Sequence, residues 1–199
     1  QTLFLYGGAD DYSEGCITLK QSGGTSLVLT YGTVYDNIIL VAGNALTANV
    51  WNHVLVTFDG GTTGNDPLQG SAYYGRFSIV VDGVALSTVG VATNSGYTGA
   101  ISGTAGASGG IYRVGRANNV HNNYFGGVIN QVAVWDTDQT ANVATIYNSG
   151  ATQDLSLLAD APDHVYEIGA SVTTITDSIG SADLTGYNLA LSDIVTDSP

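Results

Sequence analysis

The sequence predicts an all-β protein with one short helix, and three observations lead to this fold class. Gly accounts for 27 of the 199 residues, roughly twice its usual share. Good helix formers are scarce, because the chain has no Met, one Lys and two Glu. Val, Ile, Thr, Tyr and Asn are abundant and gather in short runs separated by turn residues, which is typical of strands and hairpins.

Short strand-like runs follow one another through the first two thirds of the chain. The dipeptide Asp82-Gly83 follows one of these runs and predicts a hairpin turn, since both residues tolerate positive φ. The run from Val54 to Phe58 is almost continuously apolar, which favours a strand buried on both faces. We expect strands at residues 2–6, 16–21, 26–31, 37–42, 53–58, 76–81, 110–115 and 127–135.

One helix and two long loops complete this part of the chain. Residues 138–150 begin with capping residues and end with Gly, which predicts a helix with Val143, Ile146 and Tyr147 on one face. Residues 60–75 and 93–110 are too rich in Gly, Ser and Thr for core strands. Long loops of this kind serve either as contact surfaces or as passive surface, and the sequence leaves both alternatives open.

The charge excludes several classes of partner. The formal net charge is −13, from 17 acidic and 4 basic residues, so neither nucleic-acid binding nor attraction to an anionic membrane is expected. No apolar run is long enough for a transmembrane helix, and the single cysteine, Cys16, excludes an intrachain disulfide. Residues 151–199 carry eight acids and no Lys or Arg. We interpret them as an ordered acidic extension, with strands at 164–168 and 172–176, that docks on a basic surface or around a cation.

Three blocks of sequence resemble the laminin-G-like, concanavalin-A-like lectin–glucanase superfamily. They are Asn49–Gly60, which contains the Trp-x-His pattern; Arg76–Val84; and Val114–Arg116 followed by Tyr124–Trp135. The resemblance implies an antiparallel β-sandwich of jelly-roll type over residues 1–150, with the acidic extension at 151–199. It also implies that about 30–50 residues of the domain's first strands are missing before Gln1.

The extension carries a second resemblance. Pro162–Gly169 and Ile175–Asn188 are similar to the C-terminal part of such domains in phage and algal-virus structural proteins. This resemblance implies a virion protein that contacts other virion proteins or copies of itself, as a homo-oligomer or a subunit of a larger assembly.

The residues give little support for catalysis. Retaining or inverting glycosidases need two facing carboxyls, and the superfamily's glucanases place Glu residues on one strand. Here Glu14 and Glu167 are far apart in sequence, and the family's acidic pair is replaced by Asn130-Gln131. We therefore expect no enzymatic activity.

Two sets of residues are candidates for binding. Loop aromatics with polar neighbours could stack on a sugar or on a protein partner, and the sequence does not choose between them. Acidic loop residues provide the oxygen ligands that Ca²⁺ prefers, so calcium is the one cofactor that the sequence suggests. The aromatic set is Tyr73, Tyr74, Tyr97, His121 and Tyr124, and the acidic set is Asp10, Asp11 and Asp66.

The function that the sequence favours is therefore a non-enzymatic structural protein of a virus particle. A capsid decoration or a tail or fibre component fits best, with attachment to the host surface as a further role. The alternative is a carbohydrate-binding or adhesion module of a larger secreted protein, which would place the chain outside the cell rather than in the virion.

Overall fold

A computed structural model of the chain describes residues 1–7, 16–32, 37–59, 77–92, 111–116, 124–169 and 171–195. The chain divides into two compact units, Gln1–Gly126 (unit 1) and Gly127–Pro199 (unit 2), which we describe separately. This division precedes the domain boundary at residue 150 that the sequence suggests, and that boundary stays a prediction.

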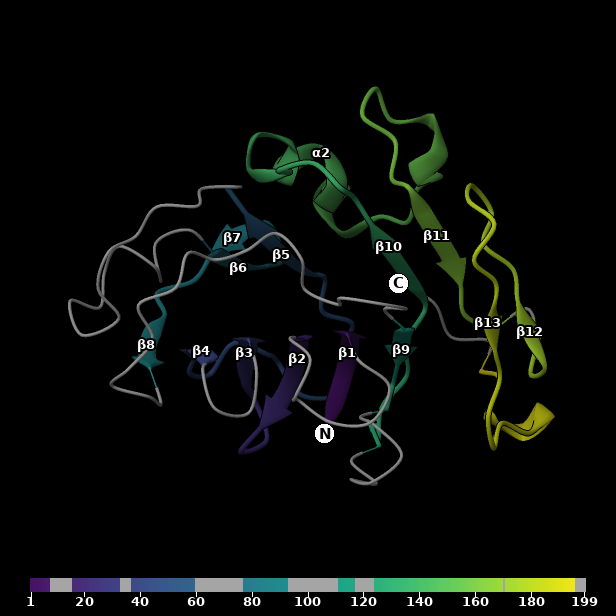
Figure 1. Cartoon of the computed structure of the whole chain (residues 1–199), viewed down its shortest axis with the longest axis horizontal. Helices are drawn as coiled ribbons and strands as arrows, with labels where there is room; N and C mark the ends of the chain where they lie inside the picture. The colour runs from purple at the N-terminus through teal and green to yellow at the C-terminus, as the bar shows by residue number, and fades with distance from the viewer. Residues whose placement is uncertain are drawn as a thin grey trace. The chain divides into compact units, whose positions relative to one another are not determined.

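Unit 1 contains a sheet of six antiparallel strands (Figure 1). The N-terminal strand lies inside the sheet, between the second strand and the last strand of the unit. The spatial order is β8 (Val89–Ala92), β4 (Asn37–Ala42), β3 (Ser26–Gly32), β2 (Cys16–Ser22), β1 (Thr2–Gly7) and β9 (Ile111–Val114).

A second antiparallel sheet of unit 1 consists of β5 (Val54–Phe58), β6 (Phe77–Val81) and β7 (Val84–Ala85). Asp82 and Gly83 connect β6 to β7 with φ angles of 50° and 76°, which confirms the predicted hairpin. The prediction that β5 is buried on both faces is wrong, because its residues alternate between buried and half-buried. Such alternation is typical of a strand with one face toward the core.

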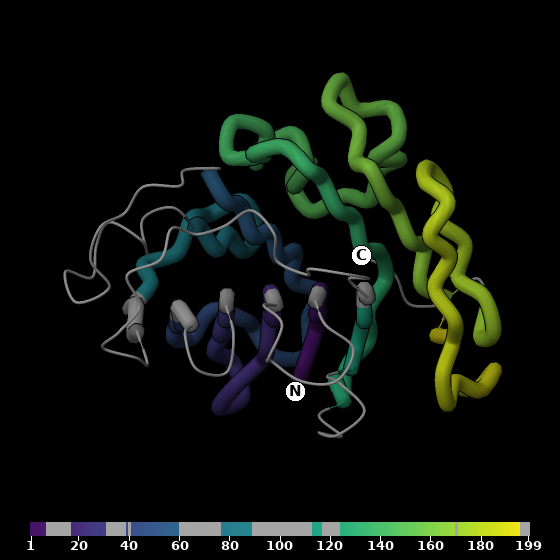
Figure 2. Tube along the Cα trace, viewed as in Figure 1, coloured from purple at the N-terminus to yellow at the C-terminus, as the bar shows by residue number. Residues whose placement is uncertain are grey.

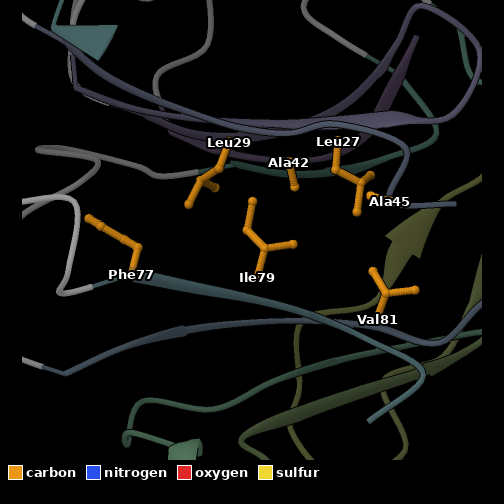
Figure 3. Close-up of a cluster of buried hydrophobic side chains, with 7 residues drawn as sticks. All are labelled: Leu27, Leu29, Ala42, Ala45, Phe77, Ile79 and Val81. Carbon is orange, nitrogen blue, oxygen red and sulfur yellow. The ribbon is translucent and has the colours of Figure 1, made fainter. Parts of the chain in front are cut away.

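The core of unit 1 lies between these two sheets. The six-stranded sheet contributes Leu27, Leu29 and Ala42 to this core, and Ala45, which follows β4, joins them. These side chains pack against three side chains of β6 (Figure 3). Those three are Phe77, Ile79 and Val81, the alternate residues of the strand. Their spacing by two places all of them on one face, which is why β6 can contribute its whole apolar side to the core.

Unit 2 begins with a strand pair joined by a helical connection. β10 (Gln131–Val134) pairs antiparallel with β11 (His164–Glu167), and the two run side by side in Figure 2. The predicted helix is confirmed in a shorter form: α2 (Val143–Tyr147) lies between the 3₁₀ turns η3 (Thr140–Asn142) and η4 (Asn148–Gly150). A further 3₁₀ turn, η5 (Leu155–Leu157), precedes β11.

The rest of unit 2 is a short hairpin and a final turn. β12 (Thr174–Ile175) pairs antiparallel with β13 (Leu184–Thr185), and the 3₁₀ turn η6 (Leu191–Asp193) follows. Taken together, the described residues form antiparallel sheets with one short α-helix, so the all-β prediction is confirmed. No helix among these residues is long and apolar enough to cross a membrane.

Candidate functional site

Most of the residues that the sequence singles out for binding lie outside the described ranges. This applies to Tyr73, Tyr74, Tyr97 and His121 and to the acidic set of Asp10, Asp11 and Asp66. The two long loops, residues 60–75 and 93–110, lie there as well. The roles of these residues therefore stay predictions.

Tyr124 is the one predicted binding residue that the structure describes. Its side chain is 44% exposed, and the guanidinium carbon of Arg116 lies 5.7 Å from the centre of its ring. At this distance the cation is attracted to the ring face. The neighbouring backbone is fixed as well, because the N–H of Phe125 donates to the carbonyl oxygen of Gly115 at 2.8 Å. Tyr124 is thus an exposed aromatic ring whose position is partly fixed by a cation.

The strongest concentration of polar contacts surrounds a residue that the sequence analysis did not select, Asp177. Its side chain is fully buried, and its two oxygens accept five hydrogen bonds. One donor is the Nδ1 of His164, at 2.6 Å from Oδ2. The others are the backbone N–H groups of Val165, Ile179, Gly180 and Ala182, at 3.0–3.3 Å.

The hydrogen bonds decide the ionisation state of Asp177. Burial by itself would raise the pKa of this carboxyl, but the bonds from His164 and from the backbone of Gly180, Ala182 and Val165 outweigh it. They hold the pKa well below its usual range, so Asp177 is a carboxylate at neutral pH. Because a carboxylate can only accept, the proton between Asp177 and His164 belongs to the Nδ1 of the ring.

Residues Asp177–Asp183, which we call the aspartate turn, fold around this carboxylate and dock on β11. The backbone N–H of Asp177 donates to Oδ1 of Asp183 at 2.9 Å. The N–H of Ser178 donates to the carbonyl oxygen of Val165 at 2.9 Å, and Tyr166 forms an antiparallel bridge with Asp177. The Tyr166 hydroxyl, on a side chain with no exposed surface, donates to the carbonyl oxygen of Ala182 at 3.0 Å.

Gly180 is the residue that lets the aspartate turn close. A Cβ atom at this position would touch Oδ2 of Asp177, and it would lie 2.6 Å from Nδ1 of His164 and 2.9 Å from the carbonyl oxygen of Asp163. One of these neighbours is backbone, so a side chain could not be accommodated by rotating a flexible group alone. The Asp-x-x-Gly spacing at residues 177–180 therefore has a packing reason.

Seven other carboxylates of unit 2 are also used as hydrogen-bond acceptors within the unit. Asp138 accepts from the N–H and hydroxyl of Thr140, and Asp154 does the same for Ser156 at the start of η5. Asp160 accepts from the hydroxyl of Thr137 and from the buried amide of Gln139, at 3.2 and 2.7 Å. The further acceptors are Asp163, Glu167, Asp183 and Asp193.

These contacts satisfy the carboxylate oxygens without neutralising their charge. The donors are backbone N–H, hydroxyl and amide groups, together with the His164 ring. Residues 127–199 contain ten acids and no Lys or Arg, so unit 2 has a formal charge of −10 out of the −13 of the whole chain. Among the residues that the structure describes, no group of three or more His, Cys, Asp or Glu could hold a metal ion.

Unit 2 also contains a run of exposed apolar side chains. We call residues Tyr187–Val195 the C-terminal apolar segment. Four of its large side chains are exposed, namely Tyr187 (64%), Leu189 (43%), Leu191 (77%) and Val195 (44%). Exposed apolar side chains concentrated in this way are typical of contact sites rather than of an ordinary surface.

The sequence contained a signal for the aspartate turn but not for the network around it. The resemblance proposed for residues 175–188 stays a prediction, while the structure gives Asp177 and Gly180 of that stretch a defined role. The partnership with His164, thirteen residues earlier, depends on the pairing of chain segments and has no local sequence signature.

An Asp–His pair can orient an imidazole for general-base catalysis, but in this site Asp177 also holds four backbone groups. The arrangement thus builds a rigid turn on β11.

The chain matches no protein-family model, no curated protein and no solved structure.

Proposed function

We propose that the chain is a non-enzymatic structural protein of a virus particle, located in the virion, that acts through contacts with other virion proteins or with copies of itself. In this proposal the domain is a jelly-roll β-sandwich of the concanavalin-A-like kind. The two antiparallel sheets of unit 1, with an apolar cluster between them, support that architecture.

One observation carries the functional proposal: the carboxylates of unit 2 accept hydrogen bonds that fix the conformation of backbone turns. Eight of its acids accept hydrogen bonds from groups of the same unit, and Asp177, with its five donors, is the centre of the largest network. A carboxylate that acts on a substrate needs an open side toward it. Carboxylates that fix backbone turns instead serve a surface of constant shape, which is what a structural protein needs for repeated contacts.

Quantitative mass spectrometry of purified particles from the source of the sequence tests this proposal. We expect peptides of the chain in a fixed ratio to the main capsid protein, and association of the purified chain in sedimentation velocity runs at rising concentration. Peptides found in the secreted or cell-surface fraction but not in particles would overturn the proposal. Turnover of a polysaccharide by the wild type that disappears in His164→Gln would overturn its non-enzymatic part.

The exposed ring of Tyr124 favours a second candidate, a carbohydrate-binding or adhesion module. An aromatic side chain that is 44% exposed beside the Arg116 guanidinium offers both a stacking face and a hydrogen-bond donor to a sugar. A glycan array tests this candidate. Loss of a specific signal in Tyr124→Ala, but not in Tyr187→Ala, would support it, since both variants remove one exposed tyrosine. An array without specific signal would contradict it.

We propose that the fold needs no cofactor, with calcium as the one exception that the acidic loop residues suggest. Saturating Ca²⁺ at a hundred times its Kd would stabilise the fold by about 2.7 kcal/mol. Thermal unfolding in EDTA and in excess Ca²⁺ should therefore give the same midpoint if no cation binds. A higher midpoint in Ca²⁺ that Asp66→Asn or the double change of Asp10 and Asp11 to Asn abolishes would establish a calcium site.

A further inference from the structure

We infer that the C-terminal apolar segment, Tyr187–Val195, is a docking element for a protein partner with an apolar groove flanked by Lys and Arg residues. The inference deepens the proposed function and rests on it, because it names the partner chemistry for one contact of the proposed structural protein. Three observations carry it: the exposed side chains, the local order of the segment and the charge of unit 2.

The first observation is the density of exposed apolar side chains. Four of the seven large exposed apolar residues of unit 2 lie within these nine residues. Tyr187, Leu189 and Leu191 follow one another at a spacing of two, and Val195 comes one turn later. The segment is bent rather than extended, because Asn188 has a φ of 57° and Leu191 begins η6, so its four exposed side chains are close together in the chain without following the alternation of a strand.

The second observation is that the segment is held in shape while its apolar side chains remain exposed. At its start, the N–H of Gly186 donates to the carbonyl oxygen of Thr173 at 2.9 Å, and a Cβ on Gly186 would overlap the carbonyl oxygen of Val172. At its end, Oδ2 of Asp193 accepts from the N–H of Ala190 at 2.8 Å, and the N–H of Asp193 donates to the carbonyl oxygen of Ala190. A preorganised segment loses less conformational entropy on binding.

The third observation, the charge, selects the partner. Two copies of unit 2 would each have a formal charge of −10, so contact between two such segments would be opposed by repulsion that reaches over roughly 10 Å at moderate salt. Anionic membranes are disfavoured for the same reason. A groove with basic flanks removes this repulsion and is attracted by the net negative charge of unit 2, while its apolar floor covers the leucines.

The test uses a fluorescent helix-forming peptide of Leu and Lys, with the leucines on one face, as a stand-in for such a groove. Binding to the full chain is measured by anisotropy, next to peptides in which Glu replaces Lys or Gln replaces Leu. We expect the Leu/Lys peptide to bind most tightly and to weaken as ionic strength rises. The double variant Leu189→Ser, Leu191→Ser should lose about tenfold or more in affinity, since each leucine buries apolar area.

The matched control is Leu157→Ser, which removes the most exposed leucine of unit 2 (81%) from a site outside the segment. We expect its affinity for the Leu/Lys peptide to stay within about twofold of the wild type. Equal affinities of the control and the double variant would overturn the inference, because the leucines of the segment would then contribute no more to binding than an exposed leucine elsewhere in unit 2. A marked fall in the thermal midpoint of the double variant would also overturn it, by showing that the leucines cover the chain's own residues.

Two further outcomes separate this inference from its competitors. Concentration-dependent dimerisation that the double variant abolishes would assign the segment to a second copy, and binding to phosphatidylcholine vesicles that it abolishes would assign it to a membrane. Either result overturns the basic protein partner. The presence of the chain in purified particles is a separate measurement, so the proposed function can fail or stand independently of the peptide result.

Discussion

The two units of the chain are stabilised by different kinds of contact. Unit 1 has an apolar cluster between two sheets, in which Leu27, Ile79 and Ala42 have no exposed surface. Unit 2 has short strand pairs, and its most connected residue is a buried carboxylate with five donors. The comparison teaches that an acidic segment with little regular structure can still be well defined when its acids accept hydrogen bonds from turns.

The charges divide in the same way. All four Lys and Arg residues precede residue 117, and unit 1 has a formal charge of −3 from seven acids and four bases. Unit 2 has ten acids without a Lys or Arg. Eight of the ten acids of unit 2 accept hydrogen bonds from uncharged groups or from His164 within the unit.

The largest effect should come from breaking the apolar core of unit 1. Ile79→Ala removes a fully buried side chain from the cluster and should lower the free energy of unfolding by about 2–5 kcal/mol. Ile79→Val should lose about 0.5–1.5 kcal/mol. Denaturant titration measures the loss, and hydrogen exchange should locate it in β6 and its partners. A loss as small as that of Val84→Ala, an exposed position, would show that the cluster does not stabilise unit 1.

The corresponding change in unit 2 is Asp177→Ala, which leaves four backbone N–H groups and His164 without their acceptor. We expect a loss of about 3 kcal/mol, and a smaller loss for Asp177→Asn, which keeps one acceptor oxygen. Hydrogen exchange should increase at Val165, Gly180 and Ala182 and remain unchanged in β6. Protected amides in the aspartate turn of Asp177→Ala would contradict the role that we assign to this carboxylate.

Acid should affect the two units in different pH windows. In unit 1, burial lowers the pKa of His53 below its ordinary value of 6.5, an effect that Asp82 partly offsets. The stabilisation from neutral His53 is present above pH 6.5 and is lost as the pH falls below it. The lowered pKa of Asp177 places its window lower: its stabilisation is present above pH 3.8 and is lost only as the pH falls below that value.

Unfolding measured from pH 8 to pH 2 on the wild type, His53→Gln and Asp177→Asn checks this order. His53→Gln should remove the contribution of His53 to the pH dependence just below 6.5, and Asp177→Asn should remove the contribution of Asp177 below about 4. If the His53→Gln curve parallels the wild type through mild acid, the environment of His53 does not contribute to stability in the way that its burial implies.

Much of the fold could be predicted from the sequence, because its signals are local. Alternation and turn residues located β1–β4 and β6 to within about two residues, and Asp82-Gly83 gave the hairpin. The strands that were missed, β7, β8 and β13, are two to four residues long, too short for alternation to appear. Pairing of β10 with β11 spans some thirty residues and depends on tertiary contacts that no local pattern records.

The candidate site was less accessible to sequence reasoning. Tyr124 was selected as a loop aromatic, and the structure describes it as exposed beside Arg116. Neither Asp177 nor His164 belongs to a metal or catalytic spacing in the sequence. Their pairing needs β11 and the aspartate turn to be brought together first. The high Asp and low Glu content has a physical explanation in these turns, since the shorter side chain caps nearby backbone N–H groups.

The smallest predicted effect concerns the acids that cap short turns of unit 2. It distinguishes hydrogen bonding from charge as the way in which these acids stabilise the unit. Asp154 caps η5 by accepting from the N–H of Ser156 at 3.0 Å, so Asp154→Ala should cost about 1 kcal/mol. Asp154→Asn keeps an acceptor oxygen, so it should lower the free energy of unfolding by only about a few tenths of 1 kcal/mol, as expected for a neutral capping residue. If unit 2 uses its acids as hydrogen-bond acceptors, Asn restores stability; if their charge matters, Asn and Ala behave alike. Thermal unfolding of the three proteins at low and high salt distinguishes the two, because only a contribution from charge is screened.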